Sequence, residues 1–183
     1  MKKIETPLTD TVIQTLHAGD EVALTGTIYT ARDQAHRRLC EILKKKKNLP
    51  IDLLGQVLYY TGPTPPVKNK PFGSCGPTTS LRMDSFTMPL LEIGLKGMIG
   101  KGERSCNIEK ALQEYSAVYF IAIGGIGALL SSYILDSRVV AFDDLGTESI
   151  KELSVKDFPL FVGNDSYGKS LFSSRDRDMK NRN

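Results

Sequence analysis

The sequence contains no tryptophan, three cysteines and two histidines, and these low numbers exclude several kinds of site. Cys40, Cys75 and Cys106 are far apart and odd in number, so they form neither a disulfide framework nor a C-x-x-C metal motif. They also lack the close pairing typical of iron–sulfur ligand runs. Two histidines, His17 and His36, are too few for a zinc site without carboxylate help. We therefore predict no metal site in this chain.

The sequence also lacks long apolar runs and a broad stripe of one charge sign. No run reaches the roughly 20 apolar residues that span a membrane, and residues 1–5 contain no apolar signal core. Acidic and basic residues alternate around a net charge of +3, which does not indicate nucleic-acid binding. We therefore expect a cytoplasmic protein without a membrane or nucleic-acid partner. Residues 173–183, which are rich in basic side chains, are predicted to form a disordered tail.

Length and hydrophobic pattern favour one domain over residues 1–172. The chain has 183 residues, of which 40% are hydrophobic and 25% charged, and this suits one sizeable core. Apolar runs predict strands over residues 21–29, 54–61, 95–100, 117–123, 137–142 and 158–162. Capping signals and helical spacing predict helices that begin at Thr30 or Asp33, Pro77, Asn107 and Gly124, and a short helix over 148–153. This alternation indicates an α/β fold with a mixed sheet.

The segment from Gly76 to Ser85 combines a turn, a helix start, hydroxyls, a guanidinium and a carboxylate. Pro77 suits the first turn of a helix, and a hydroxyl from the next three residues could cap the free N–H groups. Arg82 would then lie one turn after Thr78, so a hydroxyl and a bidentate clamp could meet one substrate. The segment predicts a small carboxylate ligand. The alternative is a capped helix whose Arg82 pairs with Asp84 or another neighbour.

Two further cationic residues stand where strands are predicted to end. Arg32 follows the strand over 21–29 where a helix begins, which is the usual ligand crevice of α/β folds. Lys101 lies between two glycines after the strand over 95–100, which would aim its ammonium out of the sheet. Both are candidate anion contacts. The alternatives are an exposed surface arginine and an ordinary turn lysine.

The glycine-rich turn from Gly124 to Gly127 resembles a phosphate loop only loosely. It lacks the spacing of G-x-G-x-x-G and the Lys-Ser/Thr pair of a P-loop, so we discount nucleotide binding. Cys40 falls on the apolar side of a predicted helix and is interpreted as a core residue. Cys75, beside the turn at Gly76, either lines a pocket or fills core space.

Five strings of residues, in order along the chain, resemble a single enzyme family. They are G-T-I-Y-T-A-R-D-Q-A-H-R-R (Gly26 to Arg38), Y-Y-T-G-P-T-P (Tyr59 to Pro65), G-P-T-T-S-L-R-M-D-S (Gly76 to Ser85), K-G-M-I-G-K-G (Lys96 to Gly102) and F-D-D-L-G-T-E-S-I (Phe142 to Ile150). Together they closely resemble the β subunit, or C-terminal domain, of class I fumarate hydratases and L(+)-tartrate dehydratases. The resemblance covers nearly the whole chain apart from its ends.

The resemblance implies a swivelling β/β/α domain that works with a separate α subunit or α-domain. That partner would hold a catalytic [4Fe–4S] cluster on three cysteines, so no cofactor is expected on this chain. The complex would be a hydro-lyase, active only with the α subunit, that adds or removes water on a small dicarboxylate. Fumarate or malate is the first expectation and tartrate the second, in a homo- or hetero-oligomer. The rival interpretation is a stand-alone module that binds a dicarboxylate or phosphate without catalysis.

The resemblance also implies roles for single residues. Thr78 resembles the threonine proposed to handle the substrate proton, either as the base or by orienting substrate, and Lys101 resembles the lysine of the same pocket. These two are the expected catalytic residues. Arg32 and Arg82 resemble the arginines that hold the substrate carboxylates, and Thr79 is expected to contact substrate beside them.

Two other residues are expected to support these contacts. Asp84 would hold the guanidinium of Arg82 in its working orientation. His36, in the helix that follows Arg32, would act behind the site, and the alternative is a helix-face residue satisfied locally. Leu81 departs from the family, which usually has glycine before Arg-Met-Asp, and its side chain could crowd or reshape the substrate pocket.

Overall fold

The computed structural model describes residues 1–65 and 72–172, and its strands form one mixed, seven-stranded sheet. The strands are β1 (Lys2–Glu5), β2 (Glu21–Thr30), β3 (Val57–Tyr59), β4 (Gly97–Gly100), β5 (Val118–Ile121), β6 (Ile134–Ala141) and β7 (Ile150–Asn164). The α-helices are α1 (Asp10–Ile13), α2 (Asp33–Lys44), α3 (Asp84–Glu92), α4 (Cys106–Glu114) and α5 (Gly127–Leu130). Three 3-10 helices are η1 (Ser80–Met83), η2 (Ser131–Tyr133) and η3 (Asp143–Glu148). The tail expected over 173–183 lies outside the described residues.

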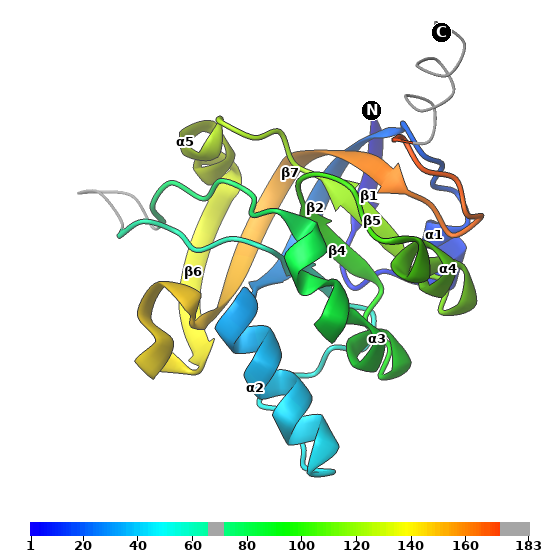
Figure 1. Cartoon of the computed structure of the whole chain (residues 1–183). Helices are drawn as coiled ribbons and strands as arrows, with labels where there is room; N and C mark the ends of the chain where they lie inside the picture. The colour runs from blue at the N-terminus through cyan, green and yellow to red at the C-terminus, as the bar shows by residue number, and fades with distance from the viewer. Residues whose placement is uncertain (66–71, 173–183) are drawn as a thin grey trace, which may run out of the picture.

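Strand β7 closes the sheet into a ring. β2, β3, β4 and β5 pair in parallel, and β7 runs antiparallel to both β5 and β2. The order β2-β3-β4-β5-β7 therefore returns to β2, while β1 extends from β2 and β6 from β7. Figure 1 shows β7 as a long curved ribbon that crosses the molecule. Because the four inner strands are parallel, their carboxyl ends lie at one edge of the ring.

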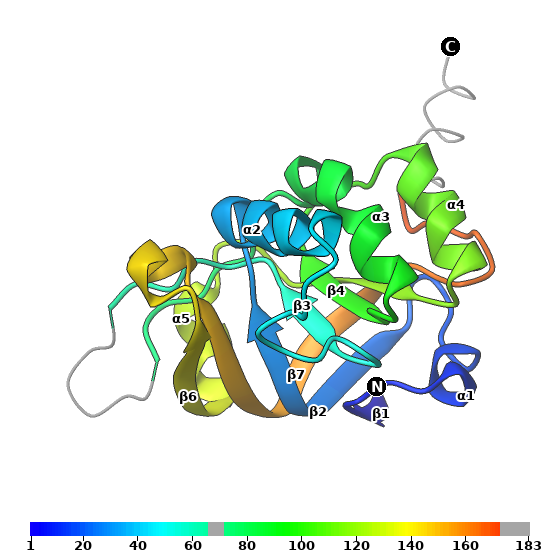
Figure 2. The ribbon, with the colours of Figure 1, turned by 90° about the horizontal axis from the view of Figure 1, so that it is seen from below.

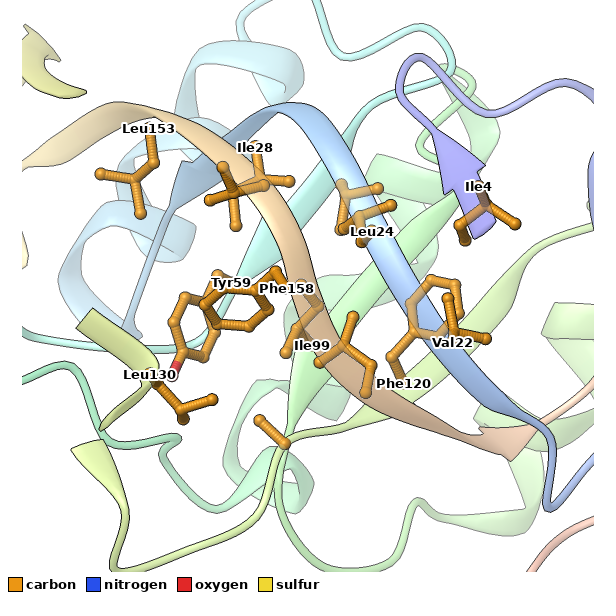
Figure 3. Close-up of a cluster of buried hydrophobic side chains, with 14 of the residues drawn as sticks. Ile4, Val22, Leu24, Ile28, Tyr59, Ile99, Phe120, Leu130, Leu153 and Phe158 are labelled. Carbon is orange, nitrogen blue, oxygen red and sulfur yellow. The ribbon is translucent and has the colours of Figure 1, made fainter. Parts of the chain in front are cut away.

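Alternate residues of the inner strands face two separate hydrophobic clusters. One cluster fills the ring and includes Val22, Leu24, Ile28, Tyr59, Ile99, Phe120, Leu153 and Phe158 (Figure 3). The other joins the opposite face of the same strands to the helices, through Leu58, Tyr60, Met98, Tyr119, Leu39, Leu90 and Leu112. A strand buried on both faces is apolar at every position rather than at every second one. This explains the continuous apolar runs that predicted these strands.

Helices α2, α3 and α4 cover one side of the sheet, as Figure 2 shows. In α2 the buried residues Ala35, Leu39 and Cys40 recur at helical spacing, so this helix and the core position of Cys40 are confirmed. The predicted cap at Thr30 or Asp33 is wrong, because Arg32 occupies the N-cap without a side-chain hydrogen bond. In residues 1–65 and 72–172, no helix has the length and apolar character to cross a membrane.

The predicted helix over residues 148–153 is wrong, because Ile150 already begins β7. Within this strand, Leu153 pairs with Ser137 of β6 on one edge and with Ile28 of β2 on the other. Backbone pairing on both edges, together with burial of Leu153 inside the ring, outweighs a weak local helix signal. The helix predicted from Gly124 is shorter than expected and begins at the last glycine of the turn.

Candidate functional site

Three of the predicted site residues lie at the carboxyl ends of the parallel strands. Arg32 follows the last residue of β2 by two positions, and Lys101 directly follows β4. Between them, the chain leaves β3 and returns as the segment that contains Thr78. This edge of a parallel sheet is where α/β proteins usually bind ligands.

Thr78, Thr79 and Lys101 are brought together by backbone pairing. The Lys101 amide donates to the Thr78 carbonyl at 3.2 Å, and the Ser80 amide donates to the Lys101 carbonyl at 2.9 Å. Thr79 and Lys101 form a parallel β-bridge, and the Thr78 amide donates to the Tyr60 carbonyl at 2.7 Å. Residues 78–80 thus form a short extended segment that ties the end of β3 to the end of β4.

This pairing corrects the expected helix start. The first helical turn after Pro77 begins at Ser80, and Thr79 precedes it without making a side-chain cap. The reason is that residues 78–80 pair with the backbone of Tyr60 and Lys101, which keeps this segment extended until the first turn begins. Thr78 and Arg82 are therefore not on one face of one helix.

The functional groups of the two threonines and the lysine remain available to a ligand. Thr78 is half-buried, and Thr79 and Lys101 are exposed. Among the residues that the structure describes, no hydrogen bond or ion pair engages the two hydroxyls or the ammonium. Gly124 lies beside the lysine, since a Cβ at that glycine would stand 3.9 Å from Cδ of Lys101. Lys101 and residues 123–125 are all exposed, so the lysine is accessible to a ligand from solvent.

Arg32 is held by charge but not by strong hydrogen bonds. Its Nη2 lies 3.7 Å from a carboxylate oxygen of Asp33 and 3.7 Å from one of Glu148, beyond hydrogen-bond distance. Its Nε is buried and has no hydrogen-bond partner in the described part of the chain. The guanidinium lies against Gly62, where a Cβ would approach Nη1 to 2.7 Å. Arg32 therefore keeps donors that a carboxylate ligand could satisfy.

Arg82 is held by Asp33 and not by Asp84. Its Nη2 donates to Oδ1 of Asp33 at 2.8 Å, while 53% of its side chain is exposed. The expectation that Asp84 orients this guanidinium is wrong, because both oxygens of Asp84 are occupied elsewhere. The Asp33 carboxylate thus lies 3.7 Å from Arg32 and 2.8 Å from Arg82. One acidic side chain is therefore close to both arginines that are predicted to bind the substrate.

Asp84 pairs with Arg104, a residue that sequence reasoning does not identify. Arg104 is buried and donates from Nε to Oδ1 of Asp84 at 2.7 Å and from Nη2 to Thr87 at 2.8 Å. The Ser105 amide donates to the other oxygen of Asp84 at 2.7 Å. This pair fixes the start of α3 to the segment after Lys101. The only sequence signal was the position of Arg104 shortly after a predicted buried strand.

His36 is fully buried behind Arg32. Its Nδ1 donates to the Arg32 carbonyl at 2.9 Å, and its ring meets the ring of Tyr60 edge-on at 5.2 Å. Burial lowers the pKa of His36 to about 4, so the imidazole is neutral at physiological pH. Its Nε2 has no hydrogen-bond partner among residues 1–65 and 72–172. His36 thus contacts the backbone of Arg32 but carries no charge toward the site.

The cysteines do not form a metal site in the described residues. Cys40 and Cys75 are buried and Cys106 is exposed, and no group of three or more His, Cys, Asp or Glu side chains could hold a metal in residues 1–65 and 72–172. Burial raises the pKa of the Cys75 thiol to about 12, and its side chain belongs to the ring core. Cys75 therefore fills core space and does not line a pocket.

Leu81 lies at the surface, 56% exposed, beside Arg82.

A cavity of about 490 Å³ is lined by none of the predicted site residues, although its lining residues Pro63 and Thr147 are the chain neighbours of Gly62 and Glu148, which lie against Arg32. It is lined by the loop after β3, by β6 and by the start of β7, including Pro63, Phe72, Val139, Thr147 and Lys151. Its lysine already donates to the Gly146 carbonyl at 3.0 Å, and its neighbour Arg138 pairs with Glu152. This cavity is mainly apolar and is a poorer candidate for an anion than the edge at Arg32 and Lys101.

Comparison with known proteins connects this chain to one family. The family model described as the fumarase C-terminus matches residues 2–175. The L(+)-tartrate dehydratase subunit beta of Escherichia coli K12 is 36% identical over 179 residues, which is 94% of this chain and 88% of the relative. The anaerobic class I fumarate hydratase of the same strain is 38% identical, and mitochondrial fumarate hydratase 1 of Leishmania major 39%, each over 82% of this chain and 28% of the relative. The chain therefore belongs to the fumarase C-terminus family.

Proposed function

We propose that this chain is the β subunit of a hydro-lyase that adds or removes water on a small dicarboxylate, and that it supplies the carboxylate-binding half of the active site. The relatives named for tartrate dehydratase and fumarate hydratase support the reaction class. Fumarate, malate and tartrate all present two carboxylates, so they are the substrates to test. The substrate choice and the roles of single residues are part of the proposal.

The observation that carries the proposal is the incomplete hydrogen bonding of Arg32. Its Nε is buried without an acceptor among residues 1–65 and 72–172, and its Nη2 is 3.7 Å from each of two carboxylates. Leaving donors of a largely buried guanidinium unpaired costs about 1–3 kcal/mol, so Arg32, whose side chain is 25% exposed, favours a ligand that can accept from its terminal nitrogens. A substrate carboxylate would accept from Arg32, and a second one from the exposed side of Arg82. The shared Asp33 would keep the two guanidinium groups apart at a fixed spacing.

Thr78 and Lys101 are proposed to act on the part of the substrate between its carboxylates. Their side chains start from paired backbone positions at the ends of β3 and β4. Adding or removing water requires a group that takes or returns the proton on carbon, and the half-buried Thr78 hydroxyl is the candidate. A threonine needs strong stabilisation to act as a base, so Thr78 either does so beside the Lys101 ammonium or orients the substrate.

We propose that an α subunit completes the site. The tartrate dehydratase relative is named as a β subunit, and the fumarate hydratases are more than three times as long as the part that matches this chain. The cysteines of this chain do not fit an iron–sulfur cluster, since no three His, Cys, Asp or Glu side chains of the described residues come together as metal ligands. We therefore assign the [4Fe–4S] cluster that the resemblance implies to the α subunit. We also propose the swivelling β/β/α arrangement for residues 1–172 and a cytoplasmic location.

Co-purification with the α subunit, followed by anaerobic assay, tests the proposal. The complex is assayed on fumarate, malate and L(+)-tartrate, with each subunit alone as the control. We expect turnover of at least one dicarboxylate by the complex and none by this chain alone. A stable complex that binds dicarboxylates without turning over any of them would overturn the proposal and favour the stand-alone binding module.

A further inference from the structure

We infer that Tyr119 is a positioning residue for Lys101, acting from beneath the site through its hydroxyl. The inference rests on the proposed function, and it concerns a residue of β5 that makes no contact with the open side of the site. Tyr119 is fully buried in the cluster between the sheet and the helices. Its hydroxyl nevertheless reaches Gly102, which follows Lys101, and Ser80, which pairs with the Lys101 backbone.

The Tyr119 hydroxyl joins the two segments that form the site. It donates to the Gly102 carbonyl at 2.9 Å, and the Ser80 hydroxyl lies 2.9 Å away and donates to it in turn. Ser80 itself donates its amide to the Lys101 carbonyl at 2.9 Å. The backbone of Lys101 is thus held from Ser80 on one side and, through Tyr119, at Gly102 on the other.

Gly100 makes room for this link. A Cβ at Gly100 would stand 1.9 Å from the Ser80 hydroxyl and 3.0 Å from the ring of Tyr60. No other residue type would allow the serine to reach beneath the end of β4. Gly100 therefore provides the space that Ser80 needs on one side of Lys101. On the other side, the Gly102 carbonyl accepts the hydrogen bond from Tyr119.

The tyrosine ring is itself held in place. The guanidinium of Arg104 lies over it at 5.1 Å and over the Tyr60 ring at 5.6 Å, and Asp84 pairs with that guanidinium. Burial raises the pKa of Tyr119, so its hydroxyl stays protonated and remains a donor. Because these neighbours hold the tyrosine ring, its hydroxyl can fix the backbone from which the flexible Lys101 side chain extends.

Tyr119→Phe in the complex with the α subunit tests the inference, because it keeps the ring and removes only the hydroxyl. We expect kcat to fall about 10- to 100-fold with KM changed less than about twofold, since the arginines that bind the carboxylates are untouched. Amide hydrogen exchange at Ser80 and Lys101 should rise at least about tenfold, while exchange in α2 stays unchanged. Ser80→Ala removes the same link from its other end and should behave alike.

Tyr167→Phe is the matched control. It removes a hydroxyl that also donates to a backbone carbonyl at 2.9 Å, that of Gln14, which is the C-cap residue of α1 and lies outside the site. We expect its kcat and site amide exchange to match the wild type. Unchanged kcat or unchanged exchange at Lys101 in both Tyr119→Phe and Ser80→Ala would overturn the inference. An inactive wild-type complex would instead refute the proposed function, and the exchange measurement would still decide whether Tyr119 positions Lys101.

Discussion

Asp33 and Arg82 are 49 positions apart in the sequence and are joined by a hydrogen-bonded ion pair of 2.8 Å. Asp33 lies in the first turn of α2, where the helix N-terminus stabilises a negative charge. The same carboxylate lies 3.7 Å from Arg32. One acidic side chain therefore sets the spacing of the two guanidinium groups that we propose to bind the substrate carboxylates.

Asp33→Asn should weaken substrate binding without unfolding the protein. The amide keeps the shape but loses the charge that orients Arg82, so we expect KM to rise about 3- to 10-fold, with a smaller change in kcat. The ion pair is partly exposed and should contribute little to the melting temperature. Asp10→Asn, which breaks the ion pair with Lys96 before β4, is the control. Equal KM values for Asp33→Asn and the wild type would show that Asp33 does not orient Arg82 for binding.

Arg82→Lys should impair the assembled enzyme although it keeps the charge. A lysine lacks the planar pair of donors that can hold Asp33 and a substrate carboxylate together. We expect kcat/KM to fall roughly 30- to 1,000-fold, equivalent to about 2–4 kcal/mol, and the melting temperature to stay nearly constant. Arg138→Lys, at the surface pair with Glu152, serves as the matched control. Full activity of Arg82→Lys would refute the carboxylate clamp.

Replacements of Thr78 can separate a role for its hydroxyl from a role for its backbone. Thr78→Ser keeps the hydroxyl, and we expect kcat within about tenfold of the wild type. Thr78→Val keeps the shape and the backbone pairing with Lys101 but removes the hydroxyl, and should lower kcat by about 100-fold or more. Steady-state kinetics of the complex decide, with Thr11→Val in α1 as the control. Similar kcat values for Val and Ser at this position would exclude the hydroxyl from the reaction.

His36 should make the free energy of unfolding depend on pH between about 6.5 and 4. Burial lowers the pKa of His36 to about 4, from an ordinary value of 6.5. In this window the unfolded chain binds a proton that the folded chain does not, so stability is complete above about pH 6.5 and decreases as the pH falls toward 4. The pKa difference corresponds to about 3 kcal/mol.

His36→Gln removes the titrating ring and tests this pH dependence. Urea unfolding at pH 7 and pH 4.5 should show a smaller loss of stability in the variant than in the wild type, even if the variant is less stable at both values. His17→Gln, at an exposed histidine, controls for the removal of a histidine side chain. Identical losses in His36→Gln and the wild type would contradict a lowered pKa for His36.

Much of the fold follows from local sequence patterns. The strands at 21–29 and 117–123 and the helix with Leu39 are confirmed because their apolar periodicity and their burial agree. Residues 148–153 could not be assigned correctly from local signals. Their conformation depends on β2 and β6, which pair with them on both edges and lie far away in the sequence.

The candidate site residues could be selected from the sequence, but their partners could not. Arg32 and Lys101 were selected because each follows an apolar strand, and parallel strands end at a common edge. The pairing of Arg82 with Asp33 joins two elements that have no local relationship in the sequence. Nor does any periodicity indicate that Arg104 is buried, because an arginine beside an exposed glutamate resembles an ordinary surface residue.

The position of β7 in the chain has a consequence for synthesis and folding. Strand β2 pairs with β7 across more than a hundred intervening residues, so the ring cannot close until residues 150–164 have left the ribosome. Until then one long edge of β2 offers unpaired backbone groups to any other strand. Chains that end before residue 150 should therefore aggregate, whereas chains that end just after β7 already contain every strand of the ring.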